Sequence, residues 1–257
     1  MLFLIGLGLD TKDLSALALE EIKEADSLFL ETYTSFIPDE YMKFIEKQAG
    51  RKPEPLKRKD LEDDLKRTVA LAKEKKVVIL VPGDPLIATT HSIVLTEAKE
   101  QGIRCRVIHA PSVFSVAIGE SGLDVYRFGP TVTVPFWHKN YKPISFIDAI
   151  KRNLENGQHT LLLLDIDQKD FAPMSIDEAT DLLNAADKEA KSNPINHDLK
   201  LVILANLGRG DQAVKYLRIE EIDAEVRKEL EGKVLSLIIP AKLTFAEQES
   251  LQRAAGK

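Results

Sequence analysis

A Gly-Asp turn between two prolines carries the strongest chemical signal in this chain. It follows Val77–Val81, an apolar and largely β-branched run that is typical of a strand buried on both faces. Pro82-Gly83-Asp84-Pro85 forces a turn where that strand ends. Ligands of open α/β sheets bind beyond the carboxyl ends of strands, so we expect Asp84 to lie at a ligand site. The alternative, in which Asp84 only stabilises the turn, stays open at this point.

A second glycine-rich loop, Gly6-Leu7-Gly8, follows the apolar run Leu2–Ile5 and precedes a helical pattern. Glycines in this position let the backbone approach a nucleotide or a sulfur-containing ligand closely. A complete dinucleotide fingerprint needs a third glycine where Thr11 stands, although Glu31 ends the next strand as a ribose-binding carboxylate would. A dinucleotide-binding module without turnover and a tight turn without ligand therefore both remain as alternatives.

Two further loops have compositions that suit ligand binding. Pro111-Ser112-Val113 stands at the expected start of a helix, where free backbone N–H groups attract a carboxylate. Simple capping of that helix by Ser112 explains the same pattern equally well. Leu207–Asp211 follows a strand and contains two glycines, but a surface turn is the commoner explanation for such a composition.

Several classes of enzyme are disfavoured by what the sequence lacks. It has neither a phosphate-binding Gly-x-x-x-x-Gly-Lys-Ser/Thr loop nor a Gly-x-Ser-x-Gly nucleophile elbow. The histidines show no spacing typical of metal ligands, so we expect no metal site; they are His91, His109, His138, His159 and His197. Cys105 lies in an expected strand and is interpreted as a small buried residue, and Trp137 is interpreted as a core residue.

The bulk composition predicts a globular protein and disfavours a binder of duplex nucleic acid, with a local basic groove left open as an alternative. The chain has 257 residues, is 44% apolar and 30% charged, and carries a net charge of −6. A single cysteine excludes an intrachain disulfide and suits a reducing compartment. The first residues lack the basic segment of a secretory signal, and no apolar run reaches membrane-spanning length. We therefore expect a cytoplasmic protein with no membrane and no nucleic-acid partner.

Strand and helix patterns alternate along the chain, which predicts the α/β class. The pattern restarts near residue 110, so we expect an N-terminal α/β domain over 1–110 and a C-terminal α/β domain over 111–257. Ser145 and the box Ser175-Ile176-Asp177-Glu178 are expected to cap helices. The expected strands are Leu2–Ile5, Ser27–Leu30, Val77–Val81, Arg104–Ile108, Thr131–Val134, Thr160–Leu164, Leu199–Ala205 and Val234–Ile239.

Taken together, these segments resemble the tetrapyrrole-methylase-like family of S-adenosylmethionine-dependent methyltransferases. The Gly-Asp-Pro turn is shared across that family, and the resemblance extends over nearly the whole chain. Glu31–Ser35 and the Ala-Thr-Thr-His ending of Pro82–His91 indicate one particular branch of it. The segments that carry the resemblance are Phe3–Leu9, Glu31–Ser35, Pro82–His91, Ala110–Val113, Thr160–Ile166 and Ile238–Leu243.

The resemblance implies two α/β domains with S-adenosylmethionine bound in the cleft between them, and a homodimer. It also implies a set of donor contacts, namely Leu9, Asp84, Ile87, Ser112, Val113, Leu163, Leu207 and Leu235. Four positions depart from the family pattern. Leu207 stands where Ala is common, Leu235 where His can occur, Ala241 where Gly is usual and Thr244 where His is usual. The last two concern the C-terminal wall of the implied site.

The reaction implied by this branch is repeated methylation of an amino group on a modified histidine, 3-carboxy-3-aminopropyl-histidine, in translation elongation factor 2. A methyltransferase of the same fold that acts on a tetrapyrrole ring is the nearest alternative. A sulfonium methyl donor is already activated, so alignment of the reacting atoms can supply much of the rate. The acceptor amine must lose a proton before each attack, and the sequence alone names no base for that step.

Overall fold

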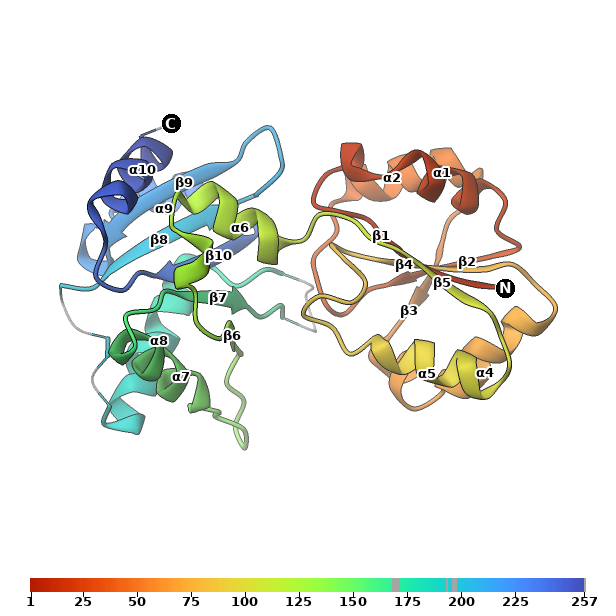
Figure 1. Ribbon diagram of the computed structural model, residues 1–257, viewed down its shortest axis with the longest axis horizontal. Coiled ribbons are helices and arrows are strands. Elements are labelled where there is room, and N and C mark those ends of the chain that lie inside the picture. Colours follow the sequence, from red (N-terminus) through yellow and green to blue (C-terminus); the bar gives the residue numbers. More distant parts are fainter. Residues whose placement is uncertain (168–171, 193, 196–197, 257) are drawn as a thin grey trace. The chain divides into compact units, whose positions relative to one another are not determined.

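The computed structural model of the protein describes residues 1–167, 172–192, 194–195 and 198–256 (Figure 1). The chain divides into two compact units, Met1–Val113 and Phe114–Lys257, each with its own sheet. This division falls close to residue 110, where the sequence pattern restarts. Within the described part of the chain, no helix is both long and apolar enough to cross a bilayer.

The first unit contains a parallel sheet of five strands in the order β3-β2-β4-β1-β5. Because all its strands are parallel, their carboxyl ends meet at one edge of the sheet. The strands are β1 (Leu2–Gly6), β2 (Ser27–Glu31), β3 (Glu54–Leu56), β4 (Val77–Val81) and β5 (Cys105–Ile108).

Helices cover both faces of this sheet, which explains why its central strands are apolar throughout (Figure 1). Leu2 and Leu4 of β1 pack toward one layer of helices, whereas Phe3 and Ile5 pack toward the other. The first layer contains α3 (Arg58–Glu62), α4 (Leu65–Ala70) and α5 (Ser92–Glu100), and the second contains α1 (Ala16–Lys23) and α2 (Asp39–Ala49).

The second unit contains a mixed sheet in the order β6-β7-β10-β8-β9. β6 and β7 are parallel, and every other neighbouring pair is antiparallel. The carboxyl ends of β7 and β8 therefore lie beside the amino end of β10. The strands are β6 (Val132–Val134), β7 (Thr160–Leu164), β8 (Lys200–Ala205), β9 (Ala213–Arg218) and β10 (Leu235–Ile239).

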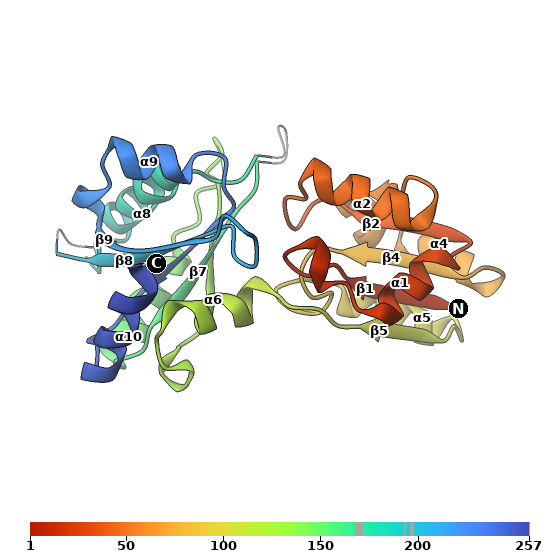
Figure 2. The same cartoon turned by 90° about the horizontal axis from the view of Figure 1, so that it is seen from above.

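Helices also lie on both faces of the second sheet (Figure 2). On one face α7 (Ser145–Glu155), α8 (Ile176–Ala190) and α9 (Ala224–Leu230) enclose the largest core of the unit. On the other lie α6 (Val113–Ser121) and α10 (Phe245–Ala255). Single 3-10 turns connect several elements: Thr11–Asp13, Leu71–Lys73, Val125–Arg127 and Ile219–Glu221.

The helix caps agree only partly with the sequence pattern. The capping box of Ser175 and Glu178 opens α8 as predicted. The prediction that Ser145 caps α7 is wrong, because Ile144 is the N-cap residue and makes no side-chain cap. Ser145 is the first residue of the helix itself. Its hydroxyl is therefore not in the N-cap position, from which a side chain accepts from the free N–H groups of the first turn. The buried face formed by Phe146, Ile147 and Ile150 fixes that start.

Candidate functional site

Backbone hydrogen bonds join the two glycine-containing loops of the first unit. Leu7 N donates to Val81 O over 2.8 Å. Gly8 and Gly83 then donate to each other's carbonyl oxygens over 3.1 Å in both directions. Both loops follow the carboxyl ends of central strands that are neighbours in the sheet. The structure therefore brings the two motifs together at the sheet edge where ligands of such folds bind.

Glycine is required at Gly6 because the loops approach each other so closely there. A Cβ at this position would lie 2.6 Å from Gly83 O and 2.9 Å from the Ala110 Cβ. Gly8 and Gly83 have φ values of +72° and +65°, a region that favours glycine. The glycines thus allow three chain segments to meet, namely the loops after β1, β4 and β5.

Asp84 links two of these loops through its carboxylate. The side chain is only 6% exposed. Its Oδ1 accepts a hydrogen bond from Leu86 N at 3.0 Å, and its Oδ2 accepts from Ala110 N at 3.3 Å and from His109 Nδ1 at 2.8 Å. Asp84 therefore stabilises its own turn, as the alternative interpretation of the Gly-Asp turn predicts. It also ties that turn to the residues after β5, and its role toward a ligand stays a prediction.

The other predicted residues of the first unit lie around the same sheet edge. Ser112 is buried, and its Cβ would lie 3.8 Å from a Cβ at Gly83. Val113 begins α6. Ile87 ends the turn that Asp84 begins and is 43% exposed, so its side chain is accessible. Leu9 N donates to Asp13 Oδ2 at 2.7 Å, which holds the loop after Gly8 in place.

The three predicted residues of the second unit gather at one end of its sheet but do not share a face. Leu163 is the penultimate residue of β7 and pairs with Ser236, so these two side chains point to the same face. Leu235, one position earlier in β10, points to the opposite face and belongs to the buried core. Leu207 is also buried, two residues after β8. A ligand contact by Leu235 would therefore involve its backbone.

Glu31 does not have the geometry of a ribose-binding carboxylate. The residue is completely buried. Its oxygens accept hydrogen bonds from the Tyr33 and Thr34 backbone N–H groups and from the Thr34 hydroxyl. These hydrogen bonds hold the carboxylate within its own turn, so it is not placed to bind a ribose. The main argument for a dinucleotide-binding module is therefore lost.

Tyr33 and His91 form a buried contact that the sequence pattern does not predict. Through His91 this contact supports the Gly-Asp-Pro turn. Tyr33 Oη lies 3.3 Å from His91 Nε2, and His91 Nδ1 lies 3.2 Å from Pro85 O. Burial raises the pKa of Tyr33 to about 12, and burial lowers the pKa of His91 against the opposing charge of Glu31. A neutral His91 that donates from Nδ1 and accepts at Nε2 satisfies both contacts.

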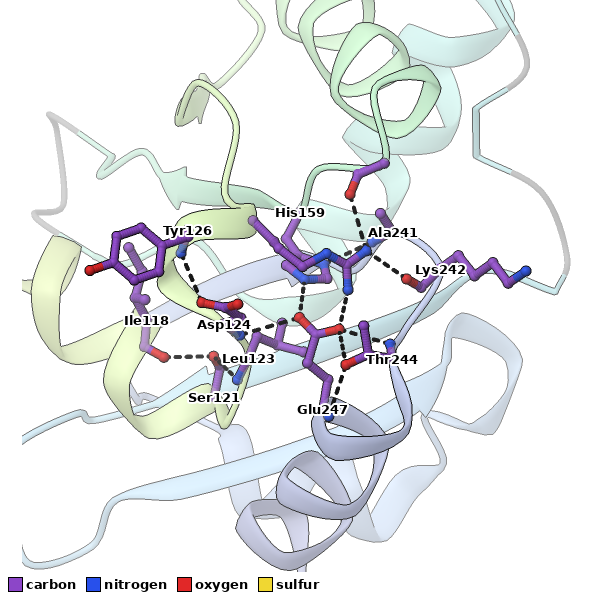
Figure 3. Close-up of polar contacts among 12 residues, drawn as sticks. Ile118, Ser121, Leu123, Asp124, Tyr126, His159, Ala241, Lys242, Thr244 and Glu247 are labelled. Atoms are coloured by element: carbon purple, nitrogen blue, oxygen red, sulfur yellow. Dashed lines mark hydrogen bonds and ion pairs between the residues drawn. The ribbon is translucent and has the colours of Figure 1, made fainter.

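A second polar cluster lies in the second unit around the buried Glu247 (Figure 3). Glu247 Oε1 accepts from His159 Nε2 at 2.8 Å and from Asp124 N at 3.3 Å. Its Oε2 pairs with Arg127 and accepts from Thr244 N at 2.8 Å. His159 is completely buried, and its Nδ1 accepts from Ala241 N at 3.0 Å. We refer to these six residues as the Glu247 cluster.

The Glu247 cluster places Ala241 and Thr244 away from the predicted donor contacts of their own unit. His159 precedes β7 and Ala241 follows β10, so the cluster lies at the opposite end of this sheet from Leu163. Thr244 caps α10 through a capping box with Glu247. Their expected place in the C-terminal wall of the site stays a prediction. What the structure shows is that both positions bear on the attachment of α10.

The same cluster fixes the charge states of its members. Burial opposes ionisation of Glu247, but hydrogen bonds from the Thr244 backbone, His159 and the Thr244 hydroxyl outweigh it and lower the pKa of Glu247 to about 2. Burial lowers the pKa of His159 despite the neighbouring carboxylate. His159 is therefore a neutral imidazole that donates from Nε2 to an ionised Glu247.

These pKa shifts predict a protein that loses stability in two steps on acidification. Unfolded histidine takes up a proton near pH 6.5, but buried His91 and His159 resist it, so their contribution is complete above pH 6.5 and declines below it. The contribution of Glu247 is complete above pH 4.5 and is lost as the pH falls toward 2. Urea denaturation at pH 8, 6, 4 and 3 measures the free energy of unfolding through both steps, and Trp137 fluorescence reports the second unit. A free energy of unfolding that rises between pH 8 and 5 would contradict it.

Other sequence expectations also receive an answer. The Trp137 indole packs against the core of the second unit and donates to Pro143 O at 3.1 Å, as expected for a core residue. Burial raises the pKa of the Cys105 thiol to about 11, which makes it unreactive. Among the described residues no group of His, Cys, Asp and Glu is arranged to hold a metal ion, and His197 lies outside them.

Comparison with known proteins shows what kind of enzyme has this geometry. Residues 1–223 match the family of tetrapyrrole (corrin/porphyrin) methylases. The chain belongs to this family. It is 36% identical to the diphthine synthase of Methanocaldococcus jannaschii, over 98% of both chains, and 39% identical to that of Archaeoglobus fulgidus, over 99% of this chain and 96% of the relative. A crystal structure of diphthine synthase superimposes with a TM-score of 0.84 at 36% identity, covering 100% of this chain and 96% of the other.

Membership of the tetrapyrrole methylase family confirms the predicted fold class and the predicted type of enzyme. The protein is a mixed α/β protein and an S-adenosylmethionine-dependent methyltransferase. The loops after β1 and β4 occupy the matched part of the chain. The residues that hold the donor stay a prediction.

Proposed function

We propose that this methyltransferase transfers methyl groups repeatedly from S-adenosylmethionine to the amino group of 3-carboxy-3-aminopropyl-histidine in translation elongation factor 2, giving diphthine in diphthamide biosynthesis. The observation that supports this most is the similarity to proteins named diphthine synthase. It spans nearly the full length of this chain and of its relatives, at 36% and 39% identity. A shared fold alone would not carry a substrate assignment, but similarity of this extent favours one.

The donor is proposed to bind at the carboxyl edge of the first sheet. There Gly8 and Gly83 join the loops after β1 and β4 through their backbones, and Asp84 holds the turn. The residues proposed to contact it in this unit are Leu9, Asp84, Ile87, Ser112 and Val113, chiefly through the backbone they position. Leu163, Leu207 and Leu235 remain predicted contacts from the second unit. The protein is further proposed to act in the cytoplasm and as a homodimer.

The chemistry of the proposed reaction suits a site without a metal or a protein nucleophile. The amine nitrogen attacks the methyl carbon, the carbon–sulfur bond breaks, and its electron pair stays on sulfur. Since the sulfonium group is already activated, the protein needs to align nitrogen, carbon and sulfur and to exclude unproductive orientations. Loops fixed by backbone hydrogen bonds and by a buried carboxylate provide such a rigid frame.

Mass spectrometry of elongation factor 2 tests the proposal directly. The factor carrying the 3-carboxy-3-aminopropyl-histidine is incubated with the enzyme and S-adenosylmethionine, and methyl additions to that residue are counted. We expect stepwise additions up to a trimethylammonium group. The alternative of a tetrapyrrole-ring methyltransferase, which the family name keeps in view, is tested in parallel with a corrin precursor. Methylation of the ring and none of the protein would overturn the proposal.

Asp84→Ala is expected to weaken donor binding. The substitution removes the acceptor for Leu86 N, Ala110 N and His109 Nδ1, so the turn loses about 1–2 kcal/mol of net hydrogen bonding. We expect the dissociation constant for S-adenosylmethionine, measured by calorimetry, to rise about five- to thirtyfold. Asp63→Ala, an exposed carboxylate at the end of α3, is the matched control and should bind normally. Unchanged affinity in Asp84→Ala would remove this turn from the donor site.

A further inference from the structure

One imidazole of the first unit is oriented by a buried carboxylate and remains accessible. His109 directly follows β5, and its Nδ1 lies 2.8 Å from Asp84 Oδ2. The carboxylate side chain is 6% exposed, whereas that of His109 is 66% exposed. Because a carboxylate only accepts hydrogen bonds, Nδ1 carries the proton in the neutral ring. Nε2 is then the nitrogen with a lone pair, on a ring fixed by its partner.

We propose that His109 is the general base of the methyl transfer and that Asp84 is its positioning residue. This rests on the proposed function, in which the acceptor is a primary amine that is protonated in neutral water. A protonated amine has no lone pair, so each transfer requires a base. A buried carboxylate that holds one ring nitrogen of a histidine directs the other ring nitrogen toward the reacting group.

The location of His109 supports this role. Ala110, its neighbour, approaches Gly6 so closely that a Cβ there would lie 2.9 Å from the Ala110 Cβ. The imidazole thus belongs to the same sheet edge as the bridged loops after β1 and β4. The partner that holds it, Asp84, begins the turn at which the donor is proposed to bind.

Three other described histidines lack this combination. His91 is fully buried, and both of its ring nitrogens have partners within the protein. The same holds for His159 in the Glu247 cluster. His138 is exposed, but it forms an isolated bridge with Tyr141 in the second unit. His109 alone among these four is both accessible and oriented by a buried carboxylate.

The proton balance of the proposed step is simple. His109 Nε2 takes one proton from the ammonium group of the acceptor, and the freed lone pair attacks the methyl carbon of the sulfonium. The nitrogen–carbon bond forms as the carbon–sulfur bond breaks, and the electron pair of that bond neutralises the sulfur. His109 then releases its proton to solvent. The methylated ammonium passes through the same cycle until a trimethylammonium group, which has no N–H left, ends the series.

Single-turnover methyl transfer to elongation factor 2, at saturating donor, tests the proposal. We expect His109→Ala to lower the rate at neutral pH by at least about 100-fold, the usual contribution of a general base. Donor affinity should change little, and His138→Ala should transfer at the normal rate. Added imidazole should restore part of the rate of His109→Ala. It should not restore that of Asp84→Asn, in which the histidine is present but loses its orienting carboxylate.

A pH series separates a base from a structural residue. Once the pH exceeds the pKa of the acceptor amine, the amine is already neutral, so the defect of His109→Ala should shrink toward high pH. The charged group that faces the ring is the Asp84 carboxylate. A rate defect of His109→Ala that has the same size at every pH and is not rescued by imidazole would overturn the proposal. A normal rate in this variant would also overturn it. His109→Gln repeats the test if the alanine variant fails to fold. Failure of the wild-type enzyme to methylate the factor would instead reject the proposed function.

Discussion

Glu247→Ala is expected to destabilise the second unit by about 3–5 kcal/mol. The substitution leaves the partly buried Arg127 without the anion that it pairs with and the completely buried His159 without its acceptor. Removal of one partner of a buried ion pair has a cost of this size, because the remaining charge stays desolvated. It also removes the capping box of α10. Urea denaturation followed by Trp137 fluorescence measures the loss, since Trp137 packs on the core of this unit.

Glu249→Ala provides the matched control for that experiment. Glu249 lies on the same helix but is exposed, so its removal should change the free energy of unfolding by less than about 0.5 kcal/mol. A loss below about 1 kcal/mol in Glu247→Ala would mean that the cluster relaxes or admits water freely. In that case it would not attach α10 to the rest of the unit.

Gly6→Ala is expected to impair the first unit and donor binding together. The added methyl group would meet Gly83 O at 2.6 Å, the Ala110 Cβ at 2.9 Å and Pro85 Cδ at 3.0 Å. Two of these contacts are with backbone or a rigid ring, so the loops themselves must move. Overpacking of this kind costs up to about 3 kcal/mol. We expect the affinity for S-adenosylmethionine, measured by calorimetry, to fall at least about 100-fold, because the shift separates the loops proposed to hold it.

Gly119→Ala tests whether that effect belongs to the site rather than to glycine replacement in general. Gly119 lies inside α6, and a Cβ there would meet no atom within 4 Å. Alanine favours a helix over glycine by about 0.5–1 kcal/mol, so this variant should be slightly more stable and bind the donor normally. Normal donor affinity in Gly6→Ala would show that the loops after β1 and β4 adjust without consequence.

The sequence predicts the interior strands better than the edges of the sheets. β1, β4 and β7 were located to within a residue, because uninterrupted apolar runs are required of strands covered on both faces. β9 was missed. Its residues Ala213–Arg218 are all half-buried and mix charged with apolar side chains, as suits a strand at the edge of a sheet. β3, a strand of only Glu54–Leu56 at the other edge, was missed for the same reason.

The candidate site was predicted as a set of loops but not as a set of contacts. Gly6, Gly8 and Gly83 were identified by their positions after strands, and their bridge follows from the adjacency of β1 and β4. His109 was considered only as a metal ligand, although it too directly follows a strand. Its pairing with Asp84 depends on the order of strands in the sheet, which local patterns do not encode. The position of Ala241 depended likewise on the direction of β10 relative to β7.

The place of β10 within the second sheet has a consequence for how the protein is made. β10 lies between β7 and β8, and α10 with Glu247 follows it near the end of the chain. The middle of the second sheet therefore stays open until β10 has left the ribosome, after β7 and β8 have already emerged. The first sheet needs only the residues up to 108 and can close while synthesis continues. Termination of synthesis before Leu235 would accordingly yield a folded first unit joined to a chain with exposed edges on β7 and β8, a ready substrate for proteases.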